Sequence, residues 1–395
     1  MKILSLFDGM ACGALAMQAA GIEIDKYIAY EIDKYAIQTA QHNFPFIEER
    51  GDVFKADFTE YAGFDYLIGG SPCTYWSIAQ TKNRETVASG MGWELFSQYV
   101  RALHEAKPRF FLYENNKSMS AAIRASITET FGFEPILINS ALVSAQNRQR
   151  LYWCGIRQAD GTYRKADIQQ PTDRGILLKD ILETGVTWID KTHTIDATYY
   201  KGGTLNREKP HQNFTRLMAA EPVCVAQRGR YDESGKVYQH YEAQPTGKTN
   251  NLTTVTKDNL IAVPICVNSK SGRASVEGLQ PSLQDRVYDT AGKMPALTTS
   301  FNPIIAEPVC VAQRGRYDAP IYEVKDGFIT VKGNKYPIKL VDGFYIIRKL
   351  TVRECMRLQT VPEWYEWPVS KSQAYKMLGN GWTVEVIAHL LRGLK

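Results

Sequence analysis

The stretch ILSLFDGMACGALAMQAAG, residues 3–21, sets the fold that we predict for the first part of this chain. A short apolar run, typical of a buried strand, leads through a glycine-bearing turn into apolar residues at helical spacing. The pattern repeats: YIAYE (27–31) precedes a helical segment, and the strand-like runs DYLIG and RFFLYEN flank the helical segment WELFSQYVRALHEA. Strands that alternate with helices predict an α/β fold, with a doubly wound, mostly parallel sheet covered on both faces.

Composition places few limits on function. The 395 residues are 44% apolar and carry a net charge of +5, which permits a nucleic-acid partner without arguing for one. No apolar run approaches the roughly 20 residues of a membrane span, and the N-terminus lacks the apolar core of a signal peptide. We therefore expect a cytoplasmic protein without a membrane partner. The seven cysteines form no CxxC pair and the six histidines no HExxH motif, so we expect neither disulfides nor a metal.

From about residue 160 the sequence changes to Thr, Asn, Gly and Gln with short β-like runs, and it contains an internal repeat. EPVCVAQRGRYD occurs at 221–232 and at 307–318, with a looser relative, PICVNSKSGR, between them; each unit has the pattern strand, glycine-rich turn, strand. A helical signature returns with the capping-box spacing Thr351–Glu354. We predict an α/β domain of residues 1–157 and 346–395, interrupted by a small β-rich domain of residues 158–345.

A lone thiol, Cys73, follows the apolar strand in FDYLIGGSPCTYWS (64–77), behind a Gly-Gly-Ser-Pro turn. A free cysteine is usually a small buried hydrophobe, which is the simpler interpretation of Cys12 and Cys355. Cys73 differs because the carboxyl end of a parallel strand is where such sheets bind ligands, and a thiolate stabilised there becomes a nucleophile. We therefore expect an acid or base at a neighbouring strand end.

Three side chains meet that expectation. Glu114 lies near the end of the strand RFFLYEN, and Arg148 and Arg150 in QNRQR supply positive charge. In the simpler interpretation Glu114 pairs with Lys117 or Arg150, and the arginines form surface ion pairs. In the functional interpretation Glu114 is an acid beside the thiol, and the arginines stabilise the thiolate or hold a phosphate group.

Taken in order along the chain, these segments resemble the motifs of the DNA cytosine-5 methyltransferase family. FDGMACG (7–13) resembles the FxGxG cofactor loop, SPC ending at Cys73 the Pro-Cys nucleophile motif, and ENN (114–116) the Glu-Asn-Val motif. The further matches, also in family order, are QNRQR with QxRxR, RKLTVRECMRLQ with RxLTxRExxRLQ, and LGNG with the closing Gly-Asn turn. Together they flank the variable middle of the chain.

The resemblance implies a Rossmann-like, S-adenosylmethionine-dependent methyltransferase fold in which residues 158–345 are the target-recognition domain. The implied cofactor is S-adenosyl-L-methionine, with S-adenosyl-L-homocysteine as product; Glu31 would contact its ribose and Asp52 its adenine. The residues implied at this cofactor site are Phe7, Asp8, Gly9, Ala11, Cys12, Gly13, Glu31, Ile32, Asp52, Val53, Pro72 and Asn380. Departures from the family at Ala11, Asn116 and Gly381 affect the fine geometry of the site and not the reaction.

The implied reaction uses four catalytic side chains. Cys73 adds to C6 of a cytosine, Glu114 supports N3, the methyl group is transferred to C5, and loss of the C5 proton releases the thiol; Arg148 and Arg150 complete the set. Because the attack is impossible inside a stacked duplex, the base must flip out of double-stranded DNA. We expect a sequence-specific monomer, and a cognate restriction endonuclease is left open.

Two basic segments are expected to contact DNA. The polar, glycine-bounded loop of residues 74–92 is typical of a lid, and the repeated QRGR is typical of base or phosphate contacts. A plain connector and a hairpin turn with solvated arginines are the simpler interpretations. The expected DNA-binding residues are Ser77, Gln80, Lys82, Arg84, Arg228, Arg230, Arg314 and Arg316.

Three other functions stay open at this point. An RNA cytosine-5 methyltransferase of the same fold would carry a Cys-Phe-Thr signature, which this sequence lacks. A catalytically silent DNA-binding relative would have no use for Cys73 and Glu114. A nicotinamide-dependent oxidoreductase rests only on the glycine loop and an acid about 20 residues further on.

Overall fold

The computed structural model describes residues 1–72, 75–76, 84–183, 192–193, 195, 197, 218–222, 224–231, 237–243, 260–261, 287–289, 304–306, 321–331, 334–337, 340 and 342–395. The chain divides into two compact units: unit 1 comprises residues 1–181, 191–201 and 351–395, and unit 2 comprises residues 182–190 and 202–350. Unit 1 thus continues past the predicted boundary at residue 157. The assignment of residues 158–345 to a target-recognition domain stays a prediction.

Unit 1 contains an eight-stranded sheet whose strands follow the order β3-β2-β1-β4-β5-β8-β6, with β9 paired to β8. The pairs from β3 to β5 are parallel, whereas β8 runs antiparallel to β5 and β6. The strands are β1 (Lys2–Leu6), β2 (Lys26–Tyr30), β3 (Ile47–Glu49), β4 (Tyr66–Gly69), β5 (Phe110–Asn116), β6 (Ile136–Asn139), β8 (Gln149–Arg157) and β9 (Tyr163–Lys165). The predicted α/β fold with a mostly parallel sheet is confirmed.

The helices of unit 1 begin where the sequence offers capping groups. Asp33 caps α2 by accepting from the backbone N–H of Tyr35 at 3.0 Å. The predicted capping box is present at α5, where the side chains of Thr351 and Glu354 each accept from the other's backbone N–H. The helices are α1 (Cys12–Ala19), α2 (Lys34–Asn43), α3 (Met91–Ala106), α4 (Ala121–Phe131), α5 (Val352–Leu358), α6 (Lys371–Asn380) and α7 (Val384–Gly393). Among the helices in the described residues, none is long and apolar enough to cross a bilayer.

Short elements connect these helices and strands. They are the 3-10 turns η1 (Val53–Lys55), η2 (Phe58–Tyr61), η4 (Ser140–Leu142) and η5 (Leu178–Asp180), and the parallel pair β7 (Gln146–Asn147) and β10 (Thr192–His193).

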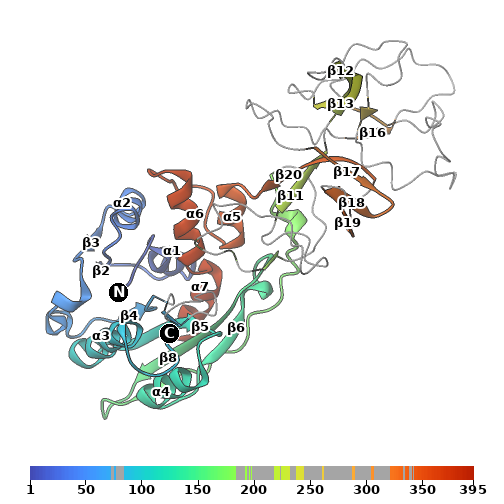
Figure 1. Cartoon of the computed structure of the whole chain (residues 1–395). Coiled ribbons are helices and arrows are strands. Elements are labelled where there is room, and N and C mark those ends of the chain that lie inside the picture. The colour runs from blue at the N-terminus through green and yellow to red at the C-terminus, as the bar shows by residue number, and fades with distance from the viewer. Residues whose placement is uncertain are drawn as a thin grey trace. The chain divides into compact units, whose positions relative to one another are not determined.

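Both faces of the sheet carry helices (Figure 1). Leu6, Leu67 and other inward side chains of the sheet form one buried cluster with α3 and α4. On the opposite face, Gly13 of α1 packs directly on Tyr27 and Ile68, and α7 packs on α1. The first and last segments of the chain therefore share one core, which fixes the loop between β1 and α1.

Unit 2, in its described residues, consists of short strands. The five-stranded sheet has the order β11-β20-β17-β18-β19, and the smaller sheets are β13-β12-β14 and β15-β16. The strands are β11 (Met218–Pro222), β12 (Cys224–Tyr231), β13 (Val237–Ala243), β14 (Leu260–Ile261), β15 (Val287–Asp289), β16 (Ile304–Ala306), β17 (Ile321–Lys325), β18 (Phe328–Val331), β19 (Asn334–Pro337) and β20 (Gly343–Lys349).

The first copy of the repeat corrects one interpretation of the sequence. Arg228 and Arg230 lie inside β12, where their backbones pair with His240 and Tyr238 of β13. The hairpin-turn interpretation of QRGR is therefore wrong for this copy, because the ladder continues through the motif. The second copy, residues 307–318, lies outside the described residues.

Gly13→Ala tests the close packing of α1 on the sheet. Alanine normally stabilises a helix interior by about 1 kcal/mol relative to glycine. Here a Cβ would lie 2.5 Å from both Ile68 Cδ1 and Tyr27 Oη, so we expect the free energy of unfolding to fall by about 1–3 kcal/mol. Urea unfolding measures this change. A variant as stable as the wild type would show that α1 can move away from the sheet.

Candidate functional site

The carboxyl edge of the parallel strands is the expected place for a ligand. The strand order changes direction between β1 and β4, because β2 and β3 lie on one side of β1 and β4 on the other. Such a reversal opens a crevice at the strand ends. The loop of residues 7–11 leaves β1 here, and residues 70–72 leave β4 beside it.

The loop after β1 has an unusual backbone. Phe7, Gly9 and Ala11 take φ values of 58°, 63° and 60°, so alternate residues are in the left-handed region. This conformation is unfavourable by about 1–2 kcal/mol for each residue other than glycine. Ala11, where the resembled family has glycine, adopts the glycine-like backbone and is fully buried. Surrounding contacts must therefore hold the loop in place.

Part of that support comes from Glu31, just after β2. One carboxylate oxygen of Glu31 accepts from Gly9 N at 2.9 Å, and the other accepts from the backbone N–H groups of Ile32 and Asp33. Phe7 N donates to Tyr30 O at 2.8 Å. The ends of β1 and β2 are thus joined by hydrogen bonds through the predicted ribose contact.

Two further carboxyl groups are buried at this edge. Asp8 accepts from the hydroxyls of Ser5 and Tyr27 through Oδ1, while Oδ2 has no hydrogen-bond partner among the described residues. Both carboxylate oxygens of Glu49 are likewise buried without a described partner. Burial raises the pKa of Asp8 to about 6 and that of Glu49 to about 8, and the neighbouring carboxylates add to the rise at Glu49. These oxygens are polar atoms whose hydrogen bonds are not made by any described residue.

The other predicted cofactor contacts differ in exposure. Ile32 is 77% exposed, Val53 is buried, and Pro72 and Asn380 are exposed. The carboxylate of Asp52 is occupied in capping η1, where it accepts from the backbone N–H of Phe54.

Cys12 is a buried thiol at the first position of α1. Its Sγ lies 3.8 Å from the carbonyl oxygen of Trp382, and burial raises the pKa of the thiol to about 12. Cys12 is therefore a neutral packing group at neutral pH, in keeping with the simpler interpretation.

Cys73 lies outside the described residues, but the segment that leads to it is well defined. Ser71 Oγ and Tyr113 Oη are 2.7 Å apart, and Asn115 Nδ2 donates to Ser71 O at 3.2 Å. A Cβ on Gly70 would lie 2.8 Å from Glu114 O and 2.9 Å from Glu114 Oε2. The end of β4 is therefore fixed directly beside the end of β5.

Glu114 contacts two donors at this position. Its Oε1 lies 3.0 Å from Arg150 Nε, and its Oε2 accepts from Trp382 Nε1 at 3.0 Å. The pairing with Arg150 follows from register, because Glu114 is opposite Tyr152 and Arg150 is two residues along β8, on the same face. Lys117 instead donates to Gln149.

Arg148 is placed differently from the surface ion pair or phosphate contact that the sequence allowed. Its side chain is 3% exposed, and the guanidinium donates to the carbonyl oxygens of Gly381 at 2.8 Å, Gly379 at 3.2 Å and Ile195 at 3.3 Å. A group so buried cannot also reach a DNA phosphate. Its described contacts join β8 to the turn between α6 and α7.

The polar loop after β4 is described only at its two ends. Arg84, a predicted DNA contact, donates to the carbonyl oxygens of Trp76 at 3.2 Å and Ser118 at 2.7 Å. The indole N–H of Trp76 donates to Glu85 at 3.0 Å. Both ends are thus anchored to unit 1. The expected DNA contacts Ser77, Gln80, Lys82, Arg314 and Arg316 lie outside the described residues, and of Arg228 and Arg230 only the backbone is described.

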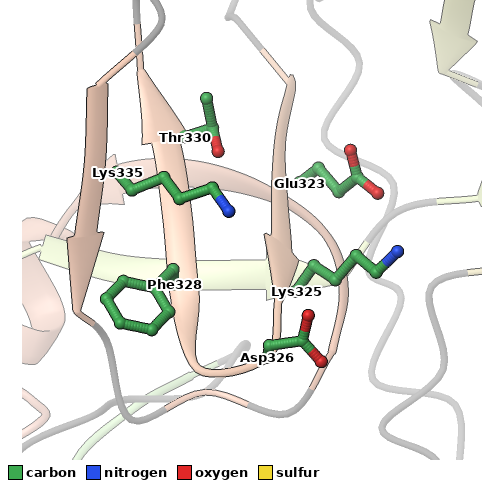
Figure 2. Close-up of a pocket in the computed structure, with 6 residues that line it drawn as sticks. All are labelled: Glu323, Lys325, Asp326, Phe328, Thr330 and Lys335. Atoms are coloured by element: carbon green, nitrogen blue, oxygen red, sulfur yellow. The ribbon is translucent and has the colours of Figure 1, made fainter.

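A hollow of about 220 Å³ lies on unit 2, over strands β17, β18 and β19 (Figure 2). Its lining mixes charges: Glu323 and Asp326 balance Lys325 and Lys335, and Phe328 and Thr330 complete it. This balance gives no preference for a polyanion. No three histidine, cysteine, aspartate or glutamate side chains that could hold a metal ion come together in the described residues.

Several residues of this site were not predicted from the sequence. Trp382 follows directly after the LGNG motif, and Asn115 stands inside ENN, so both were within reach of the motifs. Glu49 carried no signal, because IEER reads as an ordinary alternating strand end. The need for glycine at position 70 appears only once β4 and β5 are neighbours.

The fold is that of a methyltransferase. The solved structure of a Spodoptera frugiperda DNMT2 mutant has a TM-score of 0.51 to this chain at 14% identity, covering 100% of this chain and 99% of that one. The family follows from the sequence: the C-5 cytosine-specific DNA methylase profile matches residues 1–395, so this chain belongs to that family.

Full-length relatives agree with this assignment. An orphan methyltransferase of Bacillus phage SPR is 27% identical over 439 residues, covering 100% of this chain and 97% of the relative. A type II methyltransferase of Herpetosiphon aurantiacus is 23% identical over 440 residues, covering 100% and 97%.

Arg148→Met tests the carbonyl contacts of Arg148. Removing a charged donor leaves the buried carbonyl oxygens of Gly379 and Gly381 without it, so we expect the free energy of unfolding to fall by about 2–4 kcal/mol. Urea unfolding measures the loss. Arg124→Met is the control: Arg124 is half-exposed in its pair with Glu134, and the change should stay below about 1 kcal/mol. Equal losses in both variants would contradict a special role for Arg148.

Glu49→Gln tests the buried carboxyl group. In the wild type the pKa of Glu49 is raised from 4.5 to about 8, so the folded chain holds a proton that the unfolded chain releases. Stability from this group is present below about pH 4.5 and is lost as the pH rises towards 8. Because the group is partly screened by solvent, we expect glutamine to stabilise the protein at pH 8 by on the order of 1–2 kcal/mol.

Chemical unfolding at pH 5 and at pH 8 measures the effect of Glu49→Gln. Glu48→Gln is the matched control, because Glu48 is its exposed neighbour on β3 and should leave the pH dependence unchanged. An equal pH dependence in wild type and Glu49→Gln would show that Glu49 ionises normally.

Proposed function

We propose that this chain is a DNA (cytosine-5-)-methyltransferase that transfers a methyl group from S-adenosyl-L-methionine to C5 of a cytosine in double-stranded DNA. The observation that carries the proposal is the carboxyl group of Glu114, which is 12% exposed and held between Arg150 and Trp382. A Cβ built on Gly70, on the segment that leads to Cys73, would lie 2.9 Å from Oε2 of the same carboxyl group, so the two segments are neighbours. Membership of the C-5 cytosine-specific DNA methylases supports the same reaction.

The carboxyl edge of β1, β2 and β3 is the proposed cofactor site. S-adenosyl-L-methionine brings an ammonium group, ribose hydroxyls and a positively charged sulfonium. Asp8 Oδ2 and the oxygens of Glu49 are buried polar atoms without described partners, which fits a ligand that forms several hydrogen bonds. Beside them, Ile32 presents an exposed apolar side chain that suits the face of an adenine ring.

In the proposed reaction, S-adenosyl-L-methionine supplies the methyl group as an electrophile. The sulfur of Cys73 adds to C6 of the cytosine, which raises the electron density at C5. Glu114 shares a proton with N3 and so stabilises the charge that builds there, while Arg150 holds the carboxyl group in place. Loss of the C5 proton then expels the thiol and restores the aromatic ring.

DNA is the proposed partner, and the target base must leave the duplex to reach Cys73 and Glu114. The loop of residues 74–92 is the proposed lid, with Arg84 at its anchored end. Sequence recognition is assigned to residues 158–345, including the arginines of the repeat.

Methyl transfer tests the proposal directly. Purified protein and labelled S-adenosyl-L-methionine should label duplex DNA, and bisulfite sequencing of DNA from an expressing host should show 5-methylcytosine in one sequence context. Cys73→Ser should abolish turnover, at least about 10³-fold, because an alcohol is a far weaker nucleophile than a thiolate. Cofactor binding by calorimetry should be nearly unchanged. Folded protein that binds cofactor but labels no DNA of varied sequence would refute the proposal, and label on RNA alone would move it to the RNA alternative.

A further inference from the structure

The turn that follows α6 is fixed by buried side chains. Arg148 donates to Gly381 O at 2.8 Å, and Gln359 Nε2 donates to the same oxygen at 3.3 Å. Thr383 Oγ1 donates to Gln359 Oε1 at 2.8 Å, and Thr383 is only 2% exposed. Trp382 lies between Gly381 and Thr383, so its backbone is held from both sides. Its indole ring therefore projects from a rigid base.

That ring makes a single described hydrogen bond, to the oxygen of Glu114 that Arg150 does not contact. Trp382 Nε1 lies 3.0 Å from Oε2, and Arg150 Nε lies 3.0 Å from Oε1. A Cβ at Gly70 would approach Oε2 to 2.9 Å, so it is the absence of a side chain at this position that leaves room for the carboxyl group. One donor on each oxygen thus defines where both oxygens lie.

The arrangement leaves acceptor capacity for a substrate. A carboxylate has about four lone-pair sites, and Arg150 and Trp382 together use one on each oxygen. One edge of a cytosine presents its ring N3, an acceptor, next to an exocyclic amine, a donor. This edge therefore needs a proton shared between N3 and one carboxyl oxygen, and a lone pair on the other oxygen for the amine. A carboxyl group free to rotate would lose much of its effect, because catalysis depends on groups already in position.

An indole suits this task for chemical reasons. It has one N–H donor and no acceptor, so it cannot exchange roles with the substrate as a hydroxyl or a water molecule can. Its rigid ring loses little conformational entropy on being fixed. The sequence separates Trp382 and Glu114 by 268 positions, yet the closing turn brings them into contact.

We propose that Trp382 is a positioning residue of the methyl-transfer reaction, which orients Glu114 through its indole N–H. The inference rests on the proposed function and adds to it a residue on the closing turn that acts through the carboxyl group. Trp382 touches neither the thiol nor the reacting carbon in this role. Its effect is on the step in which charge builds at N3.

Trp382→Phe removes the donor and keeps an aromatic ring. We expect the single-turnover rate of methyl transfer, at saturating DNA and S-adenosyl-L-methionine, to fall about 10- to 100-fold, because a hydrogen bond to a charged group is lost. The KM values for DNA and cofactor should stay within about threefold, since a positioning residue changes kcat and not binding. Covalent trapping of Cys73 on duplex DNA containing 5-fluorocytosine should slow by the same factor.

Trp367→Phe is the matched control. Its indole N–H also makes a described hydrogen bond, to Met356 Sδ at 3.1 Å, and it has no described contact with Glu114. Its rate should equal that of the wild type. Melting temperatures of both variants separate a loss of orientation from a loss of folding.

A double-mutant cycle identifies the path of the effect. If Trp382 acts through Glu114, then Glu114→Gln combined with Trp382→Phe should be no slower than Glu114→Gln alone. Additive losses, a wild-type rate in Trp382→Phe, or a faster rate would each overturn the inference. A wild-type protein that methylates no DNA would instead remove the proposed function, so the two failures are distinguishable.

Discussion

The guanidinium group of Arg148 is the contact on which the site depends. It is buried between the sheet and the turn before α7, and it donates to the carbonyl oxygens of Gly379 and Gly381. Hydrogen bonds from charged donors are worth about 1.5–3 kcal/mol each, more than neutral ones. Through them a residue just before β8 holds a segment more than 230 positions further along the chain. The orientation of Trp382, and through it of Glu114, follows from that contact.

The loop after β1 and its neighbours contain several features that are unfavourable by themselves and are held in place by surrounding contacts. Phe7 and Ala11 are held in left-handed backbone conformations, and Asp8 and Glu49 are buried with oxygens that lack described partners. Each feature lowers stability on its own. Such strain persists only where surrounding contacts fix the chain, and here Glu31 and the end of β2 supply them. The loop and the buried carboxyl groups are thereby held in place by the fold itself.

Much of this could be predicted from the sequence, for a definite physical reason. Apolar periodicity locates the ends of strands, and parallel topology brings those ends to one edge, so Glu31, Asp52 and Glu114 could be assigned to one crevice. The environment of a side chain is harder to predict. Arg148 and Arg150 look equivalent in QNRQR, yet one contacts buried carbonyl oxygens and the other a carboxylate, because β8 begins between them.

Contacts between distant segments were beyond the sequence altogether. The contact between Trp382 and Glu114 does not follow from spacing or composition, and the same holds for the contact between Gly13 and Tyr27. Both contacts depend on which helix covers which face of the sheet. The hairpin interpretation of QRGR failed for a similar reason. A glycine between two arginines reads as a turn, but pairing with β13 keeps it extended.

The discontinuity of unit 1 has a consequence for its synthesis. Residues 1–181 leave the ribosome well before residues 351–395, so α1 at first has no α7 to pack against and Glu114 has no indole beside it. At translation speeds of about 5–20 residues per second, the intervening segment delays completion by roughly ten seconds or more. A nascent chain in that interval has every strand of the sheet but not the closing turn. The carboxyl group of Glu114 therefore gains its contact with Trp382 only after the last helices have folded onto the first.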